Sequence, residues 1–178
     1  MKQPALVARI ALFSALVYVL SWGTSYLPNI NFMFFIVFSA GLLWGVIPGI
    51  LVGAVGMGLW TMLNPYGPAP FPIMISQIIG AASSGAIGAL FRKTRWQHTS
   101  GFAVTGRLIV SALLCTILFY LPVNSVDALL FQPFWPRFIG GALWAVVPLT
   151  FNIVIFPLLF PVTRYLYGRE CGVGRSYD

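Results

Sequence analysis

Charged side chains are the scarcest feature of this 178-residue chain, and acidic residues are the rarest among them. Only 7% of the residues are Asp, Glu, Lys or Arg, against about a quarter in an average soluble domain, and three are acidic. A soluble protein of this length could not cover its surface with so few charges. Hydrophobic residues make up 59% of the chain, and the mean hydropathy is +0.91. The composition therefore predicts an integral membrane protein with one compact bundle.

The residue types that usually carry catalysis or bind metals are also nearly missing. The single histidine, His98, has neither a carboxylate nor a cysteine near it in the sequence. The two cysteines, Cys115 and Cys171, have a spacing that suits neither a disulfide framework nor a metal site. No phosphate-binding loop or nucleophile–base pair can be assembled. We therefore predict that the protein is not an enzyme and has no metal or cofactor.

Six apolar runs approach the length of about 20 residues that spans a bilayer. We expect membrane helices over about 5–22, 30–46, 48–64, 71–91, 104–122 and 138–163. The second and third runs are continuous in hydropathy. We divide them at Gly45–Pro48, because glycine ends helices and proline suits the first turn of the next helix. Residues 1–168 would then form one membrane domain, followed by a short cytoplasmic tail over 169–178.

Glycine recurs every fourth residue at Gly41, Gly45, Gly49 and Gly53. In a soluble helix each interior glycine costs about 1 kcal/mol relative to alanine. In a membrane, small residues at this spacing let two helix backbones approach closely. We therefore expect these glycines to draw the second and third helices into a tight hairpin.

The basic residues predict how the bundle is oriented. With six spans, nine of the ten Lys and Arg residues fall on the side of both termini, and only Arg137 falls on the other. By the positive-inside rule, this predicts an all-α, six-helix bundle in the cell membrane with cytoplasmic N- and C-termini. The basic residues lie at helix ends and form no patch, so no nucleic acid is expected as a partner. An ion-driven transporter is disfavoured, because the spans have essentially no ionisable residue in their middle thirds.

The three expected outer loops, at 23–29, 65–70 and 123–137, are rich in proline, amide and aromatic residues. Pro122 is expected to end the fifth helix, and Pro148 and Pro157 to bend the sixth. Unpaired amides are costly in lipid, so we expect the amides near the outer ends of the helices to face the interior of the bundle. Amides and aromatic rings together would form a pocket suited to a flat, largely uncharged ligand. An interfacial aromatic belt is the alternative reading of the rings. The candidate ligand-binding residues are Trp22, Asn31, Trp60, Asn64, Tyr66, Gln77, Asn124, Trp135, Arg137 and Trp144.

A short motif in the first predicted helix adds a family resemblance. Ala11 and Ala15 form an Ala-x-x-x-Ala pair, and Ala8 extends the same face by one turn. Together with the segment GLLWGVIPGILVGAVG and the loop NPYGP, this pattern resembles the substrate-binding S component of energy-coupling factor (ECF) vitamin transporters. The resemblance covers about residues 5–165. It implies that Ala8, Ala11 and Ala15 dock on a transmembrane coupling subunit.

The resemblance also implies a function with defined partners. A high-affinity S component in the membrane lipid captures a vitamin or related micronutrient from outside. It delivers its ligand with a coupling subunit and two cytoplasmic ATPases, by toppling in the membrane. A riboflavin-like ring, a thiamine-like ring and cobalamin bound by shape all stay open as ligands. A structural membrane scaffold without a small ligand is the main alternative function, and a small membrane enzyme is a more distant one.

Overall fold

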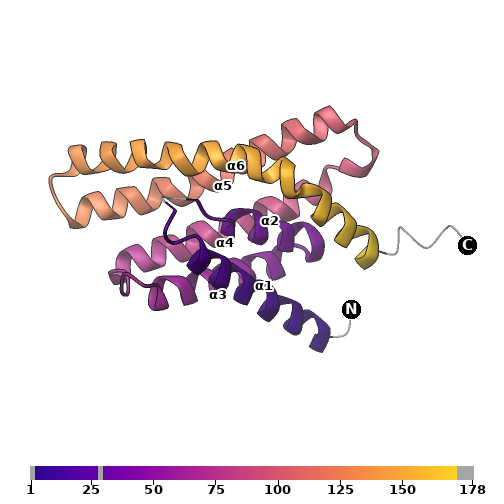
Figure 1. The fold of residues 1–178 in the computed structure, drawn as a ribbon, viewed down its shortest axis with the longest axis horizontal. Coiled ribbons are helices and arrows are strands. Elements are labelled where there is room, and N and C mark those ends of the chain that lie inside the picture. The colour runs from indigo at the N-terminus through magenta and orange to yellow at the C-terminus, as the bar shows by residue number, and fades with distance from the viewer. Residues whose placement is uncertain (1–2, 28–29, 172–178) are drawn as a thin grey trace, which may run out of the picture.

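The protein is an all-helical bundle in a computed structural model, which describes residues 3–27 and 30–171 (Figure 1). The helices are α1 (Gln3–Gly23), α2 (Met33–Trp44), α3 (Val46–Leu63), α4 (Phe71–Lys93), the 3-10 helix η1 (Trp96–His98), α5 (Gly101–Leu130) and α6 (Phe134–Cys171). Five of these helices are long and apolar enough to cross a membrane, and α2 is a shorter apolar helix. The predicted all-α membrane bundle is confirmed at this level, and no strand occurs in the described residues.

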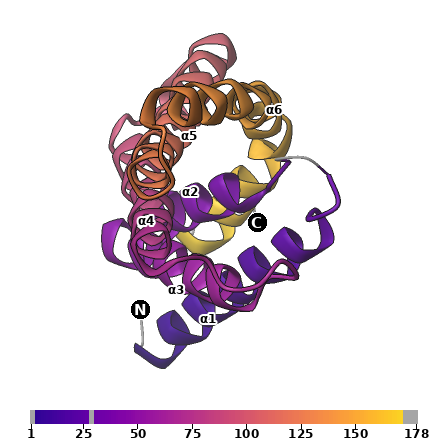
Figure 2. The same cartoon turned by 90° about the vertical axis from the view of Figure 1, so that its left-hand side faces the viewer.

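The helix α2 forms the core of the bundle. All residues from Met33 to Leu43 are buried, and α2 contacts every other α-helix. Figure 2 shows α2 in the middle of the bundle. Its 12 residues extend about 18 Å. Because the other helices surround it, this short helix stabilises the fold without having to span the hydrocarbon layer by itself.

The predicted division between the second and third helices is confirmed. Gly45 separates α2 from α3 with a φ of +99°, a conformation that side chains other than glycine rarely adopt. Pro48 follows in the first turn of α3, where its missing N–H leaves no helix hydrogen bond unmade.

The glycines bring three helices together rather than two. A Cβ atom on Gly49 of α3 would lie 2.6 Å from the Cα of Gly41 in α2 and 2.9 Å from the Cα of Gly85 in α4. A Cβ atom on Gly88 of α4 would collide with the carbonyl oxygen of Phe38 in α2. The expected hairpin of α2 and α3 is therefore one part of a unit in which α2, α3 and α4 touch backbone to backbone.

The fifth and sixth helices differ most from the expectation. Pro122 was expected to end the fifth helix, but it lies inside α5, which continues to Leu130. The expected loop at 123–137 shrinks to a turn before α6 begins at Phe134. Proline interrupts only one hydrogen bond in a helix, and neighbouring groups in membrane bundles compensate for that loss. Figure 1 shows α6 turning away from α5 in its second half, in the part of the helix that contains Pro157 and Pro161.

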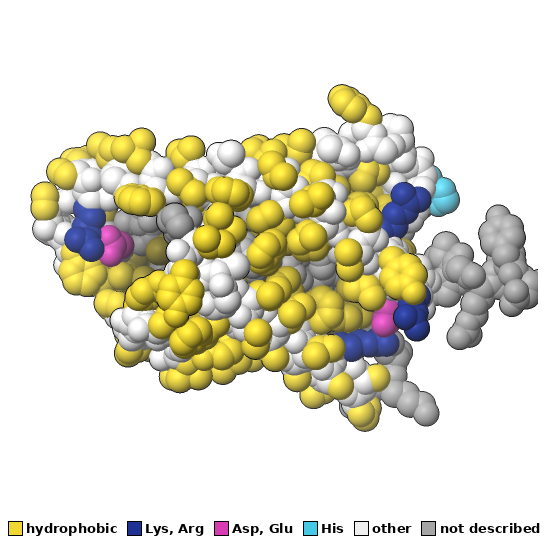
Figure 3. Space-filling view, in the orientation of Figure 1, with side chains coloured by type: hydrophobic (Ala, Val, Ile, Leu, Met, Phe, Trp, Pro, Cys, Tyr) yellow, Lys and Arg dark blue, Asp and Glu magenta, His cyan; other side chains and the backbone are white. Residues whose placement is uncertain are grey.

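Charge is segregated along the bundle. The start of α1 and the end of α6 lie at the same end, where Arg9 Nη1 is 2.9 Å from Glu170 Oε2. Most Lys and Arg side chains in Figure 3 gather there, and we call it the basic end. Its members include Arg92, Lys93, Arg95, Arg107, Arg164 and Arg169. The opposite end consists of the α1–α2, α3–α4 and α5–α6 connections and contains Arg137 paired with Asp127.

Candidate ligand-binding site

A cavity of about 240 Å³, called the ligand cavity below, lies among five helices at the end opposite the basic end. Its polar wall consists of Ser21, Thr24, Ser25, Asn31 and Gln77. Its apolar and aromatic wall consists of Leu27, Ile30, Met33, Phe34, Met57, Trp60, Tyr66, Phe119, Tyr120 and Val123. No charged side chain lines the cavity among the described residues. The site therefore suits an uncharged, partly aromatic molecule.

Hydrogen bonds from three aromatic side chains join α1 and its following turn to the end of α3 and the α3–α4 loop. Tyr18 Oη and Trp22 Nε1 both donate to the carbonyl oxygen of Leu63, at 3.2 and 3.4 Å. Tyr66 Oη donates to the carbonyl oxygen of Ser25 at 2.7 Å. These bonds hold the turn after α1 and the α3–α4 loop together beside the cavity.

The amide of Asn31 has a defined orientation. Its Oδ1 accepts hydrogen bonds from the backbone N–H of Met33 at 2.8 Å and from Ser21 Oγ at 3.1 Å. A backbone N–H can only donate, so the atom facing it must be the amide oxygen. No acceptor among the described residues takes the two N–H donors of Nδ2, which leaves them for a group in the cavity.

Gln77 on α4 has a similar arrangement. Its Oε1 accepts a hydrogen bond from Thr61 Oγ1 at 2.7 Å, and Thr61 is buried. No acceptor among the described residues takes the Nε2 donors of Gln77. The ligand cavity thus has amide donors on two different helices, α4 and the segment before α2.

Three touching aromatic rings form one side of the cavity. The ring centroids of Phe34 and Phe119 are 5.2 Å apart, and those of Phe119 and Tyr120 are 5.1 Å apart. Both pairs meet edge to face, a favourable geometry for aromatic rings. This aromatic side of the cavity can pack on the apolar face of a planar ligand.

Four of the ten predicted site residues meet in the ligand cavity, namely Asn31, Trp60, Tyr66 and Gln77. Asn64 lies in the adjoining loop, where its amide bonds the carbonyl oxygen of Gly67 at 2.8 Å and the backbone N–H of Tyr66 at 2.9 Å. Asn64 therefore shapes the loop that presents Tyr66. Trp22 is 38% exposed and contacts the end of α3.

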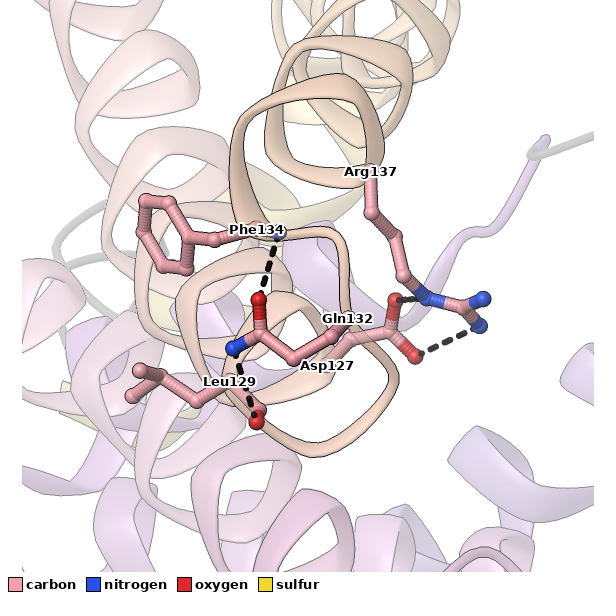
Figure 4. Close-up of polar contacts among 5 residues, drawn as sticks. All are labelled: Asp127, Leu129, Gln132, Phe134 and Arg137. Atoms are coloured by element: carbon pink, nitrogen blue, oxygen red, sulfur yellow. Dashed lines mark hydrogen bonds and ion pairs between the residues drawn. The ribbon is translucent and has the colours of Figure 1, made fainter.

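The other four predicted residues lie on the α5–α6 hairpin, outside the ligand cavity. Arg137 Nε donates to Asp127 Oδ2 at 2.6 Å across the turn, as Figure 4 shows. Trp135 and Trp144 are 68% and 61% exposed. Asn124 lines a separate, mainly apolar cavity of about 190 Å³ between α5 and α6. Because α5 continues past Pro122, the expected loop with Asn124, Trp135 and Arg137 becomes part of a helical hairpin, and Trp144 lies farther along α6, as expected for the sixth helix.

Several cavity residues are absent from the sequence-based prediction. The hydroxyl residues Ser21, Thr24 and Ser25 lie at the end of α1 and in the turn after it, and their spacing of three and four is the signal that could have found them. Phe34 and Phe119 gave no such signal, because a phenylalanine in an apolar run looks the same whether it lines a cavity or fills the core.

The alanines predicted to dock on a partner lie on an open face of α1. Ala8, Ala11 and Ala15 are exposed, whereas Ser14 and Val17 on the other side of α1 are buried. Ser14 Oγ donates to the carbonyl oxygen of Val52 in α3 at 3.5 Å. The alanine face therefore takes no part in the packing of α1 on α3.

The fold and the cavity define an all-helical membrane protein with a site for a small molecule. Residues 2–164 match the model of the family described as ECF-type riboflavin transporter, S component. The match covers most of the chain, which therefore belongs to this family, and the resemblance noted from the sequence is confirmed. No curated protein and no solved structure matches the chain. The protein is thus a substrate-binding subunit of a transporter, and its family is not one of enzymes.

Proposed function

We propose that the protein binds riboflavin, or a flavin with the same ring system, and delivers it inward with an ECF module. The observation that carries this proposal is the free Nδ2 donor of Asn31 beside an aromatic wall. The pyrimidine edge of the flavin ring carries carbonyl and ring-nitrogen acceptors, which amide donors can bind. The flat faces of the ring suit Phe34, Phe119 and Tyr120. The ribityl chain suits the hydroxyl groups at the end of α1.

The charge and size of the cavity favour a flavin over the other ligands left open by the sequence. Thiamine carries a positive charge, and no acidic side chain lines the cavity among the described residues. Cobalamin is much larger than the ligand cavity, whose volume of about 240 Å³ lies just below the usual range of ligand pockets of about 300 to 1,000 Å³.

The orientation in the membrane follows from the basic end. Positively charged helix ends remain on the cytoplasmic side of membrane proteins. The basic end, with the start of α1 and the end of α6, would then face the cytoplasm, and the ligand cavity would face outward, as uptake requires. The cell membrane is the corresponding location.

The alanine face of α1 is the proposed contact with the membrane coupling subunit. Small side chains allow close backbone contact between helices in lipid. Ala8, Ala11 and Ala15 are exposed and unused within the bundle, which supports this role. The chain has no nucleotide-binding motif, so two ATPase partners would supply the energy for transport.

Titration of the purified protein with riboflavin tests the proposed ligand. Stacking in an aromatic cavity should quench flavin fluorescence with one flavin bound per protein, and thiamine should not compete. If neither riboflavin nor any other vitamin binds the folded protein, the proposal fails and a structural scaffold becomes the better description.

A further inference from the structure

A groove between α4 and α5 near the basic end has no role in the proposed flavin site. Its volume is about 460 Å³, larger than that of the ligand cavity. On α5 it runs from Ala103 to Leu114, which corresponds to roughly 16 Å of helix. One leaflet of the hydrocarbon core is about 15 Å thick, half of about 30 Å. The α4–α5 groove thus has the length of a single leaflet.

The wall of the α4–α5 groove consists almost entirely of apolar side chains. Leu90, Val110 and Leu114 are 58%, 54% and 45% exposed, so they face the surroundings of the bundle. The hydroxyl groups in the wall are bonded within the helices: Ser111 Oγ donates to the carbonyl oxygen of Arg107 at 2.8 Å. Thr94 Oγ1 donates to that of Phe91 at 2.7 Å. Such a surface suits an acyl chain.

Arg107 places a positive charge on this apolar wall at the basic end. Its Nη1 donates to the carbonyl oxygen of Thr94 at 3.2 Å and to Thr99 Oγ1 at 3.3 Å. A guanidinium has five N–H donors, and no acceptor among the described residues takes those on Nε and Nη2, so they remain for a further acceptor. Lys93 and Arg95 adjoin Thr94 in the chain and add to the positive potential.

The described part of the protein provides no anion for this group. Its two carboxylates, Asp127 and Glu170, form ion pairs with Arg137 and Arg9. An anion that pairs with Arg107 would therefore have to come from outside the described residues. A phosphate is a strong partner for arginine, because its oxygens accept two parallel hydrogen bonds.

We infer that the α4–α5 groove binds an anionic phospholipid, with one acyl chain along Leu90, Val110 and Leu114 and the phosphate at Arg107. Basic pockets between membrane helices on the cytoplasmic side are suited to such headgroups. The groove shares no lining residue with the ligand cavity, so the lipid would be a structural partner and not the transported molecule.

Native mass spectrometry of the full-length protein with added lipid tests this inference. Phosphatidylglycerol and phosphatidylcholine with the same acyl chains are compared, and the fraction of protein with one retained lipid is measured. Phosphatidylglycerol should bind about tenfold more tightly. Arg107→Gln should weaken phosphatidylglycerol binding about tenfold. It should weaken phosphatidylcholine binding much less, because the choline cation already opposes the contact of that phosphate with a guanidinium. Arg164→Gln removes the same charge at the same end but lies outside this groove, so its binding should equal that of the unaltered protein.

Filling the groove tests the position of the acyl chain. Gly106 lines it, and a Cβ atom there meets nothing within 4 Å, so Gly106→Leu should reduce the binding of both lipids. Gly168→Leu adds the same side chain at another open position near the basic end and should not change the binding of either lipid. If Gly106→Leu does not fold, Val110→Trp fills the groove from an exposed position.

Three results would overturn the inference. The first is equal binding of both lipids by the unaltered protein. The second is an effect of Arg164→Gln as large as that of Arg107→Gln, or no effect of the folded groove-filling variant. The third is displacement of phosphatidylglycerol by an equal concentration of inorganic phosphate, which would indicate a site for free anions. None of these readouts depends on flavin binding, so they leave the proposed function unaffected.

Discussion

The unit of α2, α3 and α4 and the hairpin of α5 and α6 pack in different ways. In the unit, Gly85 of α4 lies so close to Gly49 of α3 that no side chain fits between them. In the hairpin, Gly140 has open space around its Cβ direction, and Leu143 is 67% exposed. The ligand cavity is bounded by both regions, because α2, α3 and α4 line it on one side and α5 on the other. The comparison suggests a rigid platform for the ligand, next to a hairpin that tolerates change.

Gly85→Leu should have the largest effect among the changes that test this comparison. The new side chain would meet the backbone of Gly49, which cannot move without shifting α3. Overpacking of this kind costs about 3 kcal/mol or more. The yield of monodisperse protein and its thermal unfolding in detergent measure the effect.

Gly140→Leu is the matched control in the hairpin, since nothing lies within 4 Å of its Cβ position. Its unfolding temperature should remain close to that of the unaltered protein. An equal drop in the unfolding temperature of Gly85→Leu and Gly140→Leu would show that the two regions do not differ in packing as described.

Ala11→Trp should abolish uptake while leaving the ligand cavity intact. Ala11 is exposed on α1, so under the proposed docking role a bulky side chain there should disturb the contact with the coupling subunit and not the ligand cavity. Cellular uptake of labelled riboflavin in the presence of the ECF module should fall to background. The riboflavin affinity of the purified variant should stay within about twofold of the original value. A parallel loss of binding would mean that this face is required for folding of the bundle.

Trp60→Ala and Trp144→Ala test whether the ligand contacts the unit of α2, α3 and α4 or the outer part of the α5–α6 hairpin. Trp60 lines the ligand cavity from α3, and Trp144 is exposed on α6. Loss of a ring that contacts the ligand weakens binding by about 2 kcal/mol, or roughly thirtyfold. Fluorescence titration should show this loss for Trp60→Ala and less than a twofold change for Trp144→Ala. A large loss for Trp144→Ala with little change for Trp60→Ala would indicate that the ligand binds at α6 and not in the ligand cavity.

Asp127→Asn should have the smallest effect. It breaks an exposed ion pair at the tip of the hairpin, outside the ligand cavity. Exposed ion pairs contribute little to stability, because water screens the charges. Neither the unfolding temperature nor the riboflavin affinity should change measurably. A clear loss of affinity would indicate that the hairpin tip closes over the ligand.

The helices of the platform could be predicted because local chemistry determines their ends. Gly45 must adopt a positive φ, which only glycine does readily, so the boundary between α2 and α3 could be read from the sequence. Asn31 and Gln77 could be predicted for a related reason. Each is an amide within apolar sequence, and an amide in lipid must find a partner inside the bundle.

The hairpin could not be predicted in the same way. Pro122 ends helices in water, but α5 accommodates it, and no local signal distinguishes the two outcomes. As a result, the segment after Pro122 was expected as a loop, and Asn124, Trp135, Arg137 and Trp144 were placed near the ligand. The aromatic wall of the cavity could not be predicted from the sequence either, because its position depends on which helices pack together.

The affinity of Asn31→Asp for riboflavin tests the central claim most directly. The carboxylate keeps an acceptor for the backbone N–H of Met33 and for Ser21 Oγ, so the local structure should persist. It removes the Nδ2 donors and places a negative charge against the acceptors of the flavin edge. We predict about a hundredfold weaker binding, and no change for Asn124→Asp, which lies outside the ligand cavity. Unchanged affinity of Asn31→Asp would contradict a flavin held by Asn31.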